Sequence, residues 1–519
     1  MLHALFVSLA WIAALTAAAI VIARWAFPLP SLKGRRASQS IPLSPETDLG
    51  QAVIGYMAAN PPGLSGILPL VKGTEAFAAR ILLARIAQHS IDARYYIWQK
   101  DQTGLPLLDE LRAAAARGVR VRLLVDDNGT WELDPELAML NALPNVEVRV
   151  FNPFSLRHPR WLCYFFDFSR LNRRMHNKSF CIDGAATIIG GRNIGDIYFA
   201  RDAHKQYFDF DLLAVGPIVA DGARDFDAYW NSDSSYPHER LVTPTPGYDA
   251  TFAAVVEAMI TGDEAEDYAD ALLETKLVSD LADDKLDLEW VPVTLHSDPP
   301  EKGLRFLPAR RMMIADLTRI FAGVQDSLDV VSAYFVPGRR GTRMLVRLAK
   351  AGRRVRVMTN SLEATDVLPV HASYVKYRKP LLKGGVELFE LKATQSETEK
   401  DLLGILGESA AALHAKSFVM DHDRVFVGSF NFDPRSVALN CEMGFLVQSP
   451  RLVEFLEAVF DRKSVQAAWA VELGEKRELQ WRGVDAAGGE LTTDDEPGST
   501  WKDRAAIAVI SRLPIEWLM

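Results

Sequence analysis

The chain begins with a long apolar run that differs from everything after it. Residues Ala4–Ala23 include no charged side chain, and Arg24 ends the run. A helix of about 20 apolar residues spans the hydrocarbon core of a bilayer. The alternative is a cleaved signal peptide, but its apolar region is usually shorter and follows a positively charged start. The pattern therefore predicts an uncleaved transmembrane helix over residues 1–27.

Beyond this run, strand-like and helix-like patterns alternate. Residues 28–64 are rich in proline, serine and glycine and are expected to form a linker, with a short helix at about 47–59. Residues 106–117 favour a helix, because Pro106 stands at its start, where a helix tolerates proline. Apolar and β-branched segments predict strands at 91–98, 119–125 and 146–151. Strands that alternate with helices indicate an α/β domain with a largely parallel sheet.

The same order of segments recurs in the second half of the chain. Three later segments match the first three at near-constant offsets of 234–240 residues, at 328–335, 352–358 and 386–391. We therefore predict two homologous α/β domains, and such copies tend to pack about a pseudo-two-fold axis. The expected boundaries are residues 65–240 for the first domain, 241–299 for a helical and acidic connector, 300–470 for the second domain and 471–519 for a C-terminal tail.

Size and composition agree with a folded, duplicated chain. Its 519 residues are far more than one domain needs. Hydrophobic residues make up 49% and charged residues 24%, which excludes a disordered or fibrous protein. The formal net charge of -9 argues against binding to duplex nucleic acid, which usually requires a basic surplus. The three cysteines are widely spread and form neither a disulfide framework nor a zinc pattern.

A doubled motif occupies the matching point of each copy. Each copy contains the pattern His-x-Lys-x4-Asp, and in each an asparagine follows the histidine by 17 positions. On a strand, positions i and i+2 share a face, so histidine and lysine point to the same side. A glycine-containing turn then returns the chain, so the asparagine can reach the same surface. One such motif is ordinarily a surface strand, whereas two in matching repeats indicate a shared site. Its members are His176, Lys178, Asp183 and Asn193 in the first copy and His414, Lys416, Asp421 and Asn431 in the second.

These residue types suit phosphoryl chemistry. A neutral imidazole can attack phosphorus and form a phospho-histidine, which divides one displacement into two. A second histidine can give a proton to the leaving alcohol and then take one from the incoming alcohol or water. Lysine and asparagine side chains supply donors for the non-bridging phosphate oxygens. This chemistry needs neither a metal nor a cofactor, and the sequence shows no convincing cluster of metal ligands.

The doubled motif resembles the signature of the phospholipase D superfamily, and the resemblance extends over residues 65–470. Within that superfamily, the segments around the motifs are similar to the bacterial cardiolipin synthases of the C type. Those segments are residues 95–98, 151–154, 167–180, 190–195 and 439–442. The resemblance implies an enzyme that transfers a phosphatidyl group to phosphatidylglycerol and so makes cardiolipin. The implied donor is a second phosphatidylglycerol or, for the C type, phosphatidylethanolamine.

The resemblance also implies a role for each motif residue. His176 is the implied nucleophile and His414 the general acid and base, while the motif lysines and asparagines bind the phosphate. Asp183 and Asp421 belong to the catalytic motif, but we expect them to orient the local structure rather than transfer protons. A carboxylate is expected to hold the second ring nitrogen of each histidine. The candidates are Glu442, with Asp209 or Asp211 in the first copy, and the half-sites differ where Gly191 matches Ser429.

Apolar segments precede both motifs. Trp161–Phe166 lies before His176, and Leu402–Leu406 lies before His414. Aromatic rings flanked by arginines suit a membrane interface, so one hypothesis is that both segments form lips that admit lipid tails. Ordinary core packing is the alternative. The apolar C-terminal residues 505–519 are too short to span a bilayer, and we expect them to dock on the protein.

Cations follow the predicted membrane span, at Arg24, Lys33, Arg35 and Arg36. By the positive-inside rule they place the catalytic domains in the cytoplasm, behind a single pass through the bacterial inner membrane. The expected partners are phosphatidylglycerol and phosphatidylethanolamine, and not nucleic acid. Three alternatives stay open: a phospholipase D that uses water, a phospholipase D-type nuclease and a non-catalytic lipid-binding scaffold. The sequence leaves a small-protein partner and the oligomeric state undecided.

Overall fold

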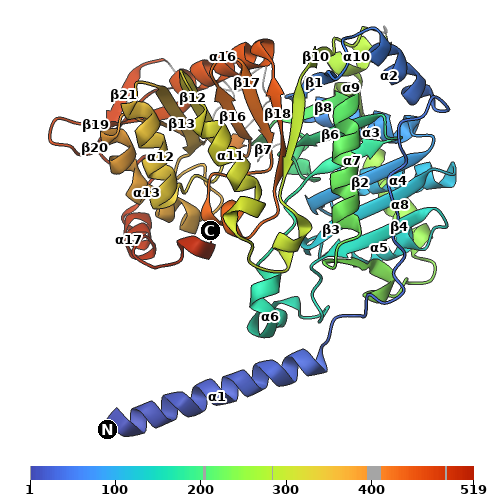
Figure 1. The fold of residues 1–519 in the computed structure, drawn as a ribbon, viewed down its shortest axis with the longest axis horizontal. Coiled ribbons are helices and arrows are strands. Elements are labelled where there is room, and N and C mark those ends of the chain that lie inside the picture. Colours follow the sequence, from blue (N-terminus) through green and yellow to red (C-terminus); the bar gives the residue numbers. More distant parts are fainter. Residues whose placement is uncertain (1, 203–205, 283–284, 394–410, 486–487, 519) are drawn as a thin grey trace.

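Two α/β domains lie side by side, and one long helix extends away from them (Figure 1). The structure is a computed structural model that describes residues 2–518, apart from 203–205, 283–284, 394–410 and 486–487. Among these residues, α1 (Leu2–Ala26) is the one helix that is long and apolar enough to cross a membrane, over Phe6–Ala26. The predicted N-terminal helix is therefore present, and it projects from the body of the protein.

Each domain is built on one sheet, and the strands follow a common order. The first sheet has the order β10-β1-β8-β6-β5-β2-β3-β4-β9. Its strands are β1 (Ser65–Leu70), β2 (Ser90–Ile97), β3 (Arg120–Gly129), β4 (Val146–Phe151), β5 (Ser179–Ile182), β6 (Ala186–Gly190), β8 (Asp211–Val215), β9 (Ser235–Pro237) and β10 (Glu289–Val291). The second sheet has the order β11-β18-β17-β16-β12-β13-β14-β19-β20-β21. Its strands are β11 (Val293–Ser297), β12 (Ser327–Ser332), β13 (Arg354–Asn360), β14 (Glu387–Leu391), β16 (Lys416–Met420), β17 (Arg424–Gly428), β18 (Met443–Gln448), β19 (Ala468–Leu473), β20 (Leu479–Val484) and β21 (Glu490–Thr493).

The strand order confirms the predicted duplication and corrects the predicted sheet type. The series β1-β8-β6-β5-β2-β3-β4-β9 matches β11-β18-β17-β16-β12-β13-β14-β19, position by position. Within these two sheets only β2-β3-β4 and β12-β13-β14 are parallel, and the other pairings are antiparallel. The prediction of a largely parallel sheet was wrong because short turns join β5 to β6 and β16 to β17. Such turns can connect only antiparallel strands.

Helices cover both faces of each sheet. On one face of the first sheet lie α3 (Gly73–Ile86), α4 (Gly104–Ala116) and α5 (Asp134–Asn141), and α8 (Tyr248–Ile260), α9 (Asp263–Leu273) and α10 (Lys276–Ala282) pack against them. On one face of the second sheet lie α11 (Met313–Ala322), α12 (Gly338–Lys350) and α13 (Leu368–Lys383). The opposite faces carry α7 (Pro217–Trp230) and α16 (Pro450–Gln466). The short 3-10 turns are η1 (Arg160–Leu162), η2 (Asp196–Tyr198), η3 (His238–Arg240), η4 (Pro300–Gly303), η5 (Ala309–Arg311) and η6 (Glu516–Leu518).

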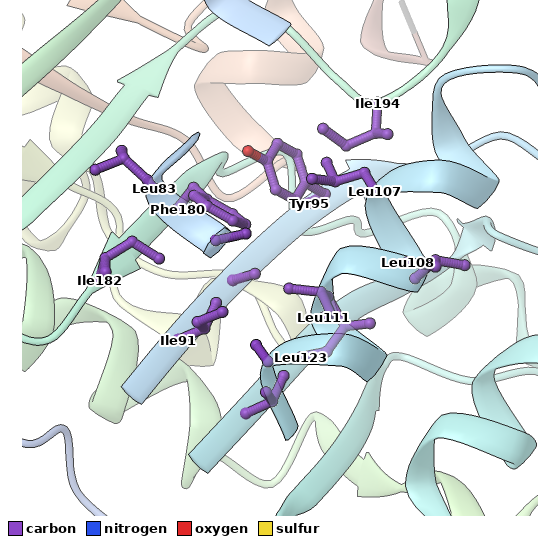
Figure 2. Close-up of a cluster of buried hydrophobic side chains, with 14 of the residues drawn as sticks. Leu83, Ile91, Tyr95, Leu107, Leu108, Leu111, Leu123, Phe180, Ile182 and Ile194 are labelled. Carbon is purple, nitrogen blue, oxygen red and sulfur yellow. The ribbon is translucent and has the colours of Figure 1, made fainter. Parts of the chain in front are cut away.

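The core of the first domain explains why α4 is a helix at this place. Its leucines 107, 108 and 111 recur at helical spacing, so they form one apolar face that points at the sheet. Figure 2 shows them packed near Ile91 of β2 and Leu123 of β3, and all five side chains are fully buried. Burying one leucine stabilises the fold by roughly 1.5–3 kcal/mol. The parallel strands are thereby held rigid beneath the segments that carry the motifs.

The two domains share an apolar interface. Strands β6 and β8 lie against β17 and β18, as expected for a pseudo-two-fold arrangement. Phe210 and Ile189 of the first domain belong to one buried cluster with Val427 and Phe445 of the second. A dry interface of this kind resists relative domain motion, so side chains from the two domains can form one rigid site.

The proline-rich segment after α1 is ordered on the protein surface rather than free. Arg35 donates hydrogen bonds to the backbone oxygens of Asn231 and Ser235, and Ser40 bonds the carboxylate of Asp227. These contacts satisfy polar groups at the end of α7, which explains why the segment docks there. The short helix predicted within it is present as α2 (Asp48–Ala58), capped by Thr47.

Other segments outside the predicted domains complete the sheets. The predicted connector contains β10 and β11, which pair with β1 and β18 at the edges of the two sheets. The predicted tail contains β20 and β21, which extend the second sheet, and α17 (Trp501–Ile510), which packs on α13. The turn η6 lies against α15 (Pro434–Ala438). The expected docking of the C-terminus is therefore confirmed.

Candidate active site

Each motif histidine is placed by a strand segment of the opposite domain. The backbone N–H of His176 donates to Cys441 O at 2.8 Å, and Met175 forms a bridge with Cys441. The backbone N–H of His414 donates to Phe208 O, also at 2.8 Å. Just before His414, β15 (Ala411–Leu413) pairs in parallel with β7 (Gln206–Phe208). Each histidine segment thus pairs with a backbone segment of the other domain, and the two pairings are alike.

Each histidine is also held by a carboxylate from the other domain. Oε2 of Glu442 lies 2.8 Å from Nδ1 of His176, and Oδ2 of Asp209 lies 2.5 Å from Nδ1 of His414. A carboxylate on Nδ1 fixes the proton there, which leaves Nε2 with a free lone pair. Of the two first-copy candidates, Asp209 meets a histidine. Asp211 does not, because its carboxylate binds Arg80 at 2.9 Å.

Sheet register shows that Asp209 and Glu442 are equivalent residues. Gly190 at the end of β6 pairs with Asp211, and Gly428 at the end of β17 pairs with Gly444. Asp209 and Glu442 each stand two residues before these partners. The two half-sites therefore use the same position with side chains of different length.

The exchange of Gly191 for Ser429 matches this difference in length. A Cβ atom at Gly191 would lie 2.1 Å from Oδ1 of Asp209, so the short carboxylate needs a glycine beside it. Glu442 is one methylene longer, and Ser429 Oγ donates to its Oε2 at 2.5 Å. Ser436 Oγ donates to Oε1 at 2.9 Å. Beside Glu442 there is thus room for the hydroxyl of Ser429, whereas beside the shorter Asp209 there is room only for a glycine.

Burial favours the neutral form of both imidazoles. It lowers the pKa of His176 and of His414 to about 4, against the opposing influence of Glu442 and Asp209. Lys416 also lowers the pKa of His176, and Lys178 lowers the pKa of His414. Each lysine therefore acts on the histidine of the other copy, which places both motifs in one electrostatic site.

The motif lysines lie against their own histidines. Lys178 Nζ donates to His176 O at 2.6 Å, and Lys416 Nζ lies 2.8 Å from His414 Nδ1. Burial lowers the pKa of Lys416 to about 8 and that of Lys178 well below its usual value. A bound phosphodiester would add negative charge beside these buried ammonium groups, to the charge that Glu442 and Asp209 already supply.

The two motif asparagines are not equally free. Asn193 is fully buried, accepts a hydrogen bond from Ile97 N at 3.2 Å and donates to Tyr198 Oη at 2.9 Å. The Oδ1 atom of Asn431 is buried, and within the described residues it takes no hydrogen bond. Asn193 is therefore engaged by the protein through both its oxygen and its nitrogen, whereas the Asn431 atom that lacks a partner among the described residues is its oxygen, an acceptor.

The motif aspartates lie at the far end of their strands. Asp183 accepts hydrogen bonds from the backbone N–H groups of residues 88, 89 and 90, and Asp421 does so from residues 325, 326 and 327. Five residues of extended chain separate each from its lysine, roughly 16 Å. The structure therefore does not bring these aspartates to the histidines, and they fasten the motif strand to the start of β2 or β12.

Aromatic rings that the motif does not contain complete the site. Tyr96 meets the His176 ring edge-on at 5.0 Å, and Tyr198 meets the His414 ring at 5.1 Å. Tyr207 stacks on His414 at 4.9 Å. Strand alternation was the available signal for Tyr96, because its neighbour Tyr95 points into the core and bonds Arg80.

The aromatic segment before His176 forms part of α6 (Cys163–Leu171), next to the N-terminal helix. Trp161 and Phe165 are 59% and 69% exposed. Phe166 is buried in a cluster with Phe154, Cys163 and Leu171, and its backbone oxygen accepts a hydrogen bond from Arg24 Nε at 2.6 Å. Half of this predicted lip is thus core and half is exposed. The second predicted lip, Leu402–Leu406, lies outside the described residues.

Comparison with known proteins shows which family the chain belongs to. The family model described as "Cardiolipin synthase, PLD-like domain" matches residues 82–228 and 317–464, one range for each motif. The chain belongs to this family. It is 43% identical to cardiolipin synthase C of Escherichia coli, over 91% of this chain and 99% of that one. It is 25% identical to a probable cardiolipin synthase of Bacillus subtilis, over 76% of this chain and 65% of that one.

A solved structure shows the same fold. The crystal structure of a phosphatidylserine synthase of Haemophilus influenzae covers 90% of this chain, and the match includes 99% of that protein. The TM-score is 0.59 and the sequence identity 15%. The described residues contain no group of three or more histidine, cysteine, aspartate or glutamate side chains that could hold a metal ion. The family fold thus presents two histidines, two lysines and two carboxylates at its centre.

Proposed function

We propose that this chain is a membrane-anchored, phospholipase D-type phosphatidyltransferase that makes cardiolipin from phosphatidylglycerol and a second phospholipid. The observation that carries this proposal is the crossed pair of histidine–carboxylate contacts in a family member 43% identical to a cardiolipin synthase. Two equivalent imidazoles, each with Nδ1 held and Nε2 free, supply the nucleophile and the proton carrier of a double displacement.

In the first step His176 acts as the nucleophile. Its Nε2 lone pair forms a bond to the donor phosphorus, and the bond from phosphorus to the headgroup oxygen breaks. His414 gives its Nε2 proton to that oxygen, so glycerol or ethanolamine leaves with a neutral hydroxyl group. For this step His414 must be protonated, and the negative charge of the bound phosphodiester raises its pKa from the low value that burial imposes.

In the second step a terminal hydroxyl of phosphatidylglycerol is the acceptor. His414 takes the hydroxyl proton, the oxygen forms a bond to phosphorus, and the bond to His176 Nε2 breaks. Lys178 and Lys416, with the NH2 group of Asn431, donate to the non-bridging oxygens and stabilise their charge. The first step converts a phosphodiester to a phospho-histidine and the second converts it back, so the overall reaction exchanges one phosphodiester for another and its direction follows the lipid concentrations.

The anchor supports a location in the bacterial inner membrane. Helix α1 has the length and composition of a single span, and cations follow it. By the same rule the catalytic domains lie on the cytoplasmic side. The substrates are then phospholipids of the same bilayer, phosphatidylglycerol as acceptor and phosphatidylglycerol or phosphatidylethanolamine as donor.

Lipid turnover by the purified full-length protein tests the proposal. The protein is added to vesicles of phosphatidylglycerol and phosphatidylethanolamine, and the products are measured by mass spectrometry. The control variants are His176→Ala and, as a matched histidine outside the site, the exposed His422→Ala. Cardiolipin is expected from wild type and His422→Ala but not from His176→Ala, and release of glycerol or ethanolamine names the donor. Phosphatidic acid without cardiolipin would instead indicate a hydrolase.

A further inference from the structure

Helix α12 is strongly basic in a chain whose net charge is -9. It contains five cations and no acidic residue: Arg339, Arg340, Arg343, Arg347 and Lys350. All five are exposed, and none forms an ion pair with any described residue. Arg339, Arg343 and Arg347 are four residues apart, so they lie on one face of the helix, where like charges repel one another. A negatively charged partner would relieve this repulsion.

A groove lies between this stripe and helix α13. It has a volume of about 1050 Å³, and Arg339, Arg343, Lys376, Tyr377 and Trp517 are among the residues that line it. A second hollow shares Arg343 and continues the groove along α12 to Arg347 and Lys350. Lys379 and Lys383 add exposed cations on α13. The carboxylate in the lining is Glu516, which pairs with Lys376.

Aromatic side chains connect the groove to the membrane anchor. Trp517, 56% exposed at the edge of the groove, meets Phe168 of α6 edge-on at 6.3 Å. The next contact runs from α6 to the end of α1, where Phe166 stacks on Phe27 at 6.2 Å. In Figure 1, α17 and the C-terminus lie on the side of the domains that faces α1. The groove and the anchor therefore belong to one face of the molecule.

From this arrangement we infer that the α12–α13 groove is a docking surface for the anionic headgroups of the bilayer that holds α1. The cations attract the negatively charged surface, and the indole of Trp517 suits the interface between headgroups and acyl chains. Docking holds the second domain against the membrane, while α1 and α6 tether the first. The inference depends on the anchor but not on which lipid the active site produces.

The continuity with α1 favours a lipid surface over nucleic acid, the other polyanion that a basic groove could bind. Aromatic residues can also stack on bases, but here their contacts lead from the groove to the membrane helix, a continuity that nucleic-acid binding does not require. The surface potential of anionic lipids extends over about one Debye length, roughly 10 Å at 0.1 M salt and 3 Å at 1 M. Docking must therefore weaken strongly with salt, whereas the anchor must not.

Energy transfer to the membrane surface can test the docking with the full-length protein in nanodiscs. The native cysteines Cys163, Cys181 and Cys441 are buried, so an introduced cysteine can be labelled selectively. A donor dye is placed at Arg340→Cys on α12 or, as the distant reference, at Gln51→Cys on α2. The acceptor is on lipid headgroups. The discs contain phosphatidylcholine alone or with 30% phosphatidylserine, an anionic lipid that is not a proposed substrate.

With the dye at residue 340, transfer is expected to rise at least two-fold in the anionic discs and to fall back in 1 M salt, while the reference dye stays unchanged. The triple variant Arg339→Glu, Arg343→Glu and Arg347→Glu should abolish the rise. A control with the same change of net charge, Lys72→Glu, Arg462→Glu and Lys476→Glu, should keep it.

The inference would be overturned if energy transfer from the dye at residue 340 were equal in the two kinds of disc, in the protein without the triple substitution. A rise that the triple variant retains would overturn it too. A third result would also overturn it: salt-dependent binding of a single-stranded oligonucleotide that the triple variant loses, without any effect of lipid charge. Because turnover does not enter the readout, failure of the docking is distinct from failure of the proposed reaction.

Discussion

The crossed contact between Glu442 and His176 makes a sharp prediction for Glu442→Gln. The glutamine is isosteric, but its amide has no charge, and its NH2 group can donate to Nδ1. The imidazole would then carry its proton on Nε2, the atom that must attack phosphorus. A charge-assisted hydrogen bond of this kind contributes about 1.5–3 kcal/mol. Since 1.36 kcal/mol is a tenfold change in rate, kcat should fall roughly 10- to 150-fold.

The assay is cardiolipin formation in mixed vesicles, with thermal unfolding measured alongside. The melting temperature should change little, because Ser429 and Ser436 can turn their hydroxyl groups to suit the amide. A second pair of variants distinguishes loss of tautomer control from general disruption of the site. Glu442→Asp alone keeps the charge but shortens the reach, whereas Glu442→Asp with Ser429→Gly copies the Asp209 and Gly191 pair of the first half-site.

The double variant should therefore be more active than Glu442→Gln and more active than Glu442→Asp alone. The reasoning would be refuted if Glu442→Gln retained wild-type kcat, because the carboxylate would then have no part in setting the imidazole tautomer. Equal activity of Glu442→Asp with and without Ser429→Gly would refute the proposed match between carboxylate length and the neighbouring residue.

Three further predictions follow from the same geometry. Gly191→Ala places a methyl group against Asp209, so kcat should fall at least tenfold with a smaller loss of stability, and unchanged turnover would contradict the close approach. Asp183→Ala removes the acceptor of three backbone N–H groups, so the free energy of unfolding should fall by about 2–4 kcal/mol in urea titration, while the folded fraction keeps its activity. Between pH 6.5 and 4 the unfolded chain protonates His176 and His414 but the folded chain does not, so acid should favour unfolding by up to about 3 kcal/mol for each histidine. Replacing both by glutamine should flatten that part of the stability profile, and an unaltered slope would show that other groups cause it.

The sequence predicted the repeat and the motif residues because both depend on local spacing. Strand alternation places a histidine and the lysine two residues later on one face, whatever the rest of the fold does. The strand segment 146–151 coincides with β4, and the two copies of that pattern could be aligned without a structure. Glu442 was also a candidate on the sequence alone, since buried histidines require an acceptor for the second ring nitrogen.

Long-range pairing could not be predicted in this way. Nothing local shows that Glu442 belongs to His176, 266 positions away, rather than to the histidine of its own copy. Whether Asp209 or Asp211 contacts a histidine depended on Arg80 of α3, which forms an ion pair with Asp211. The order of the segment after α1 likewise depended on unpaired carbonyl groups at the end of α7, which the composition of the segment does not reveal.

The exchange of carboxylates between the domains has a consequence for the chain as it is synthesised. The first half leaves the ribosome with His176 but without Glu442, so its imidazole has neither a fixed tautomer nor the strand partner at Cys441. A half-made chain therefore presents His176 without the contacts that set its tautomer. The site is complete only when the last strands of the second domain have closed on the first domain.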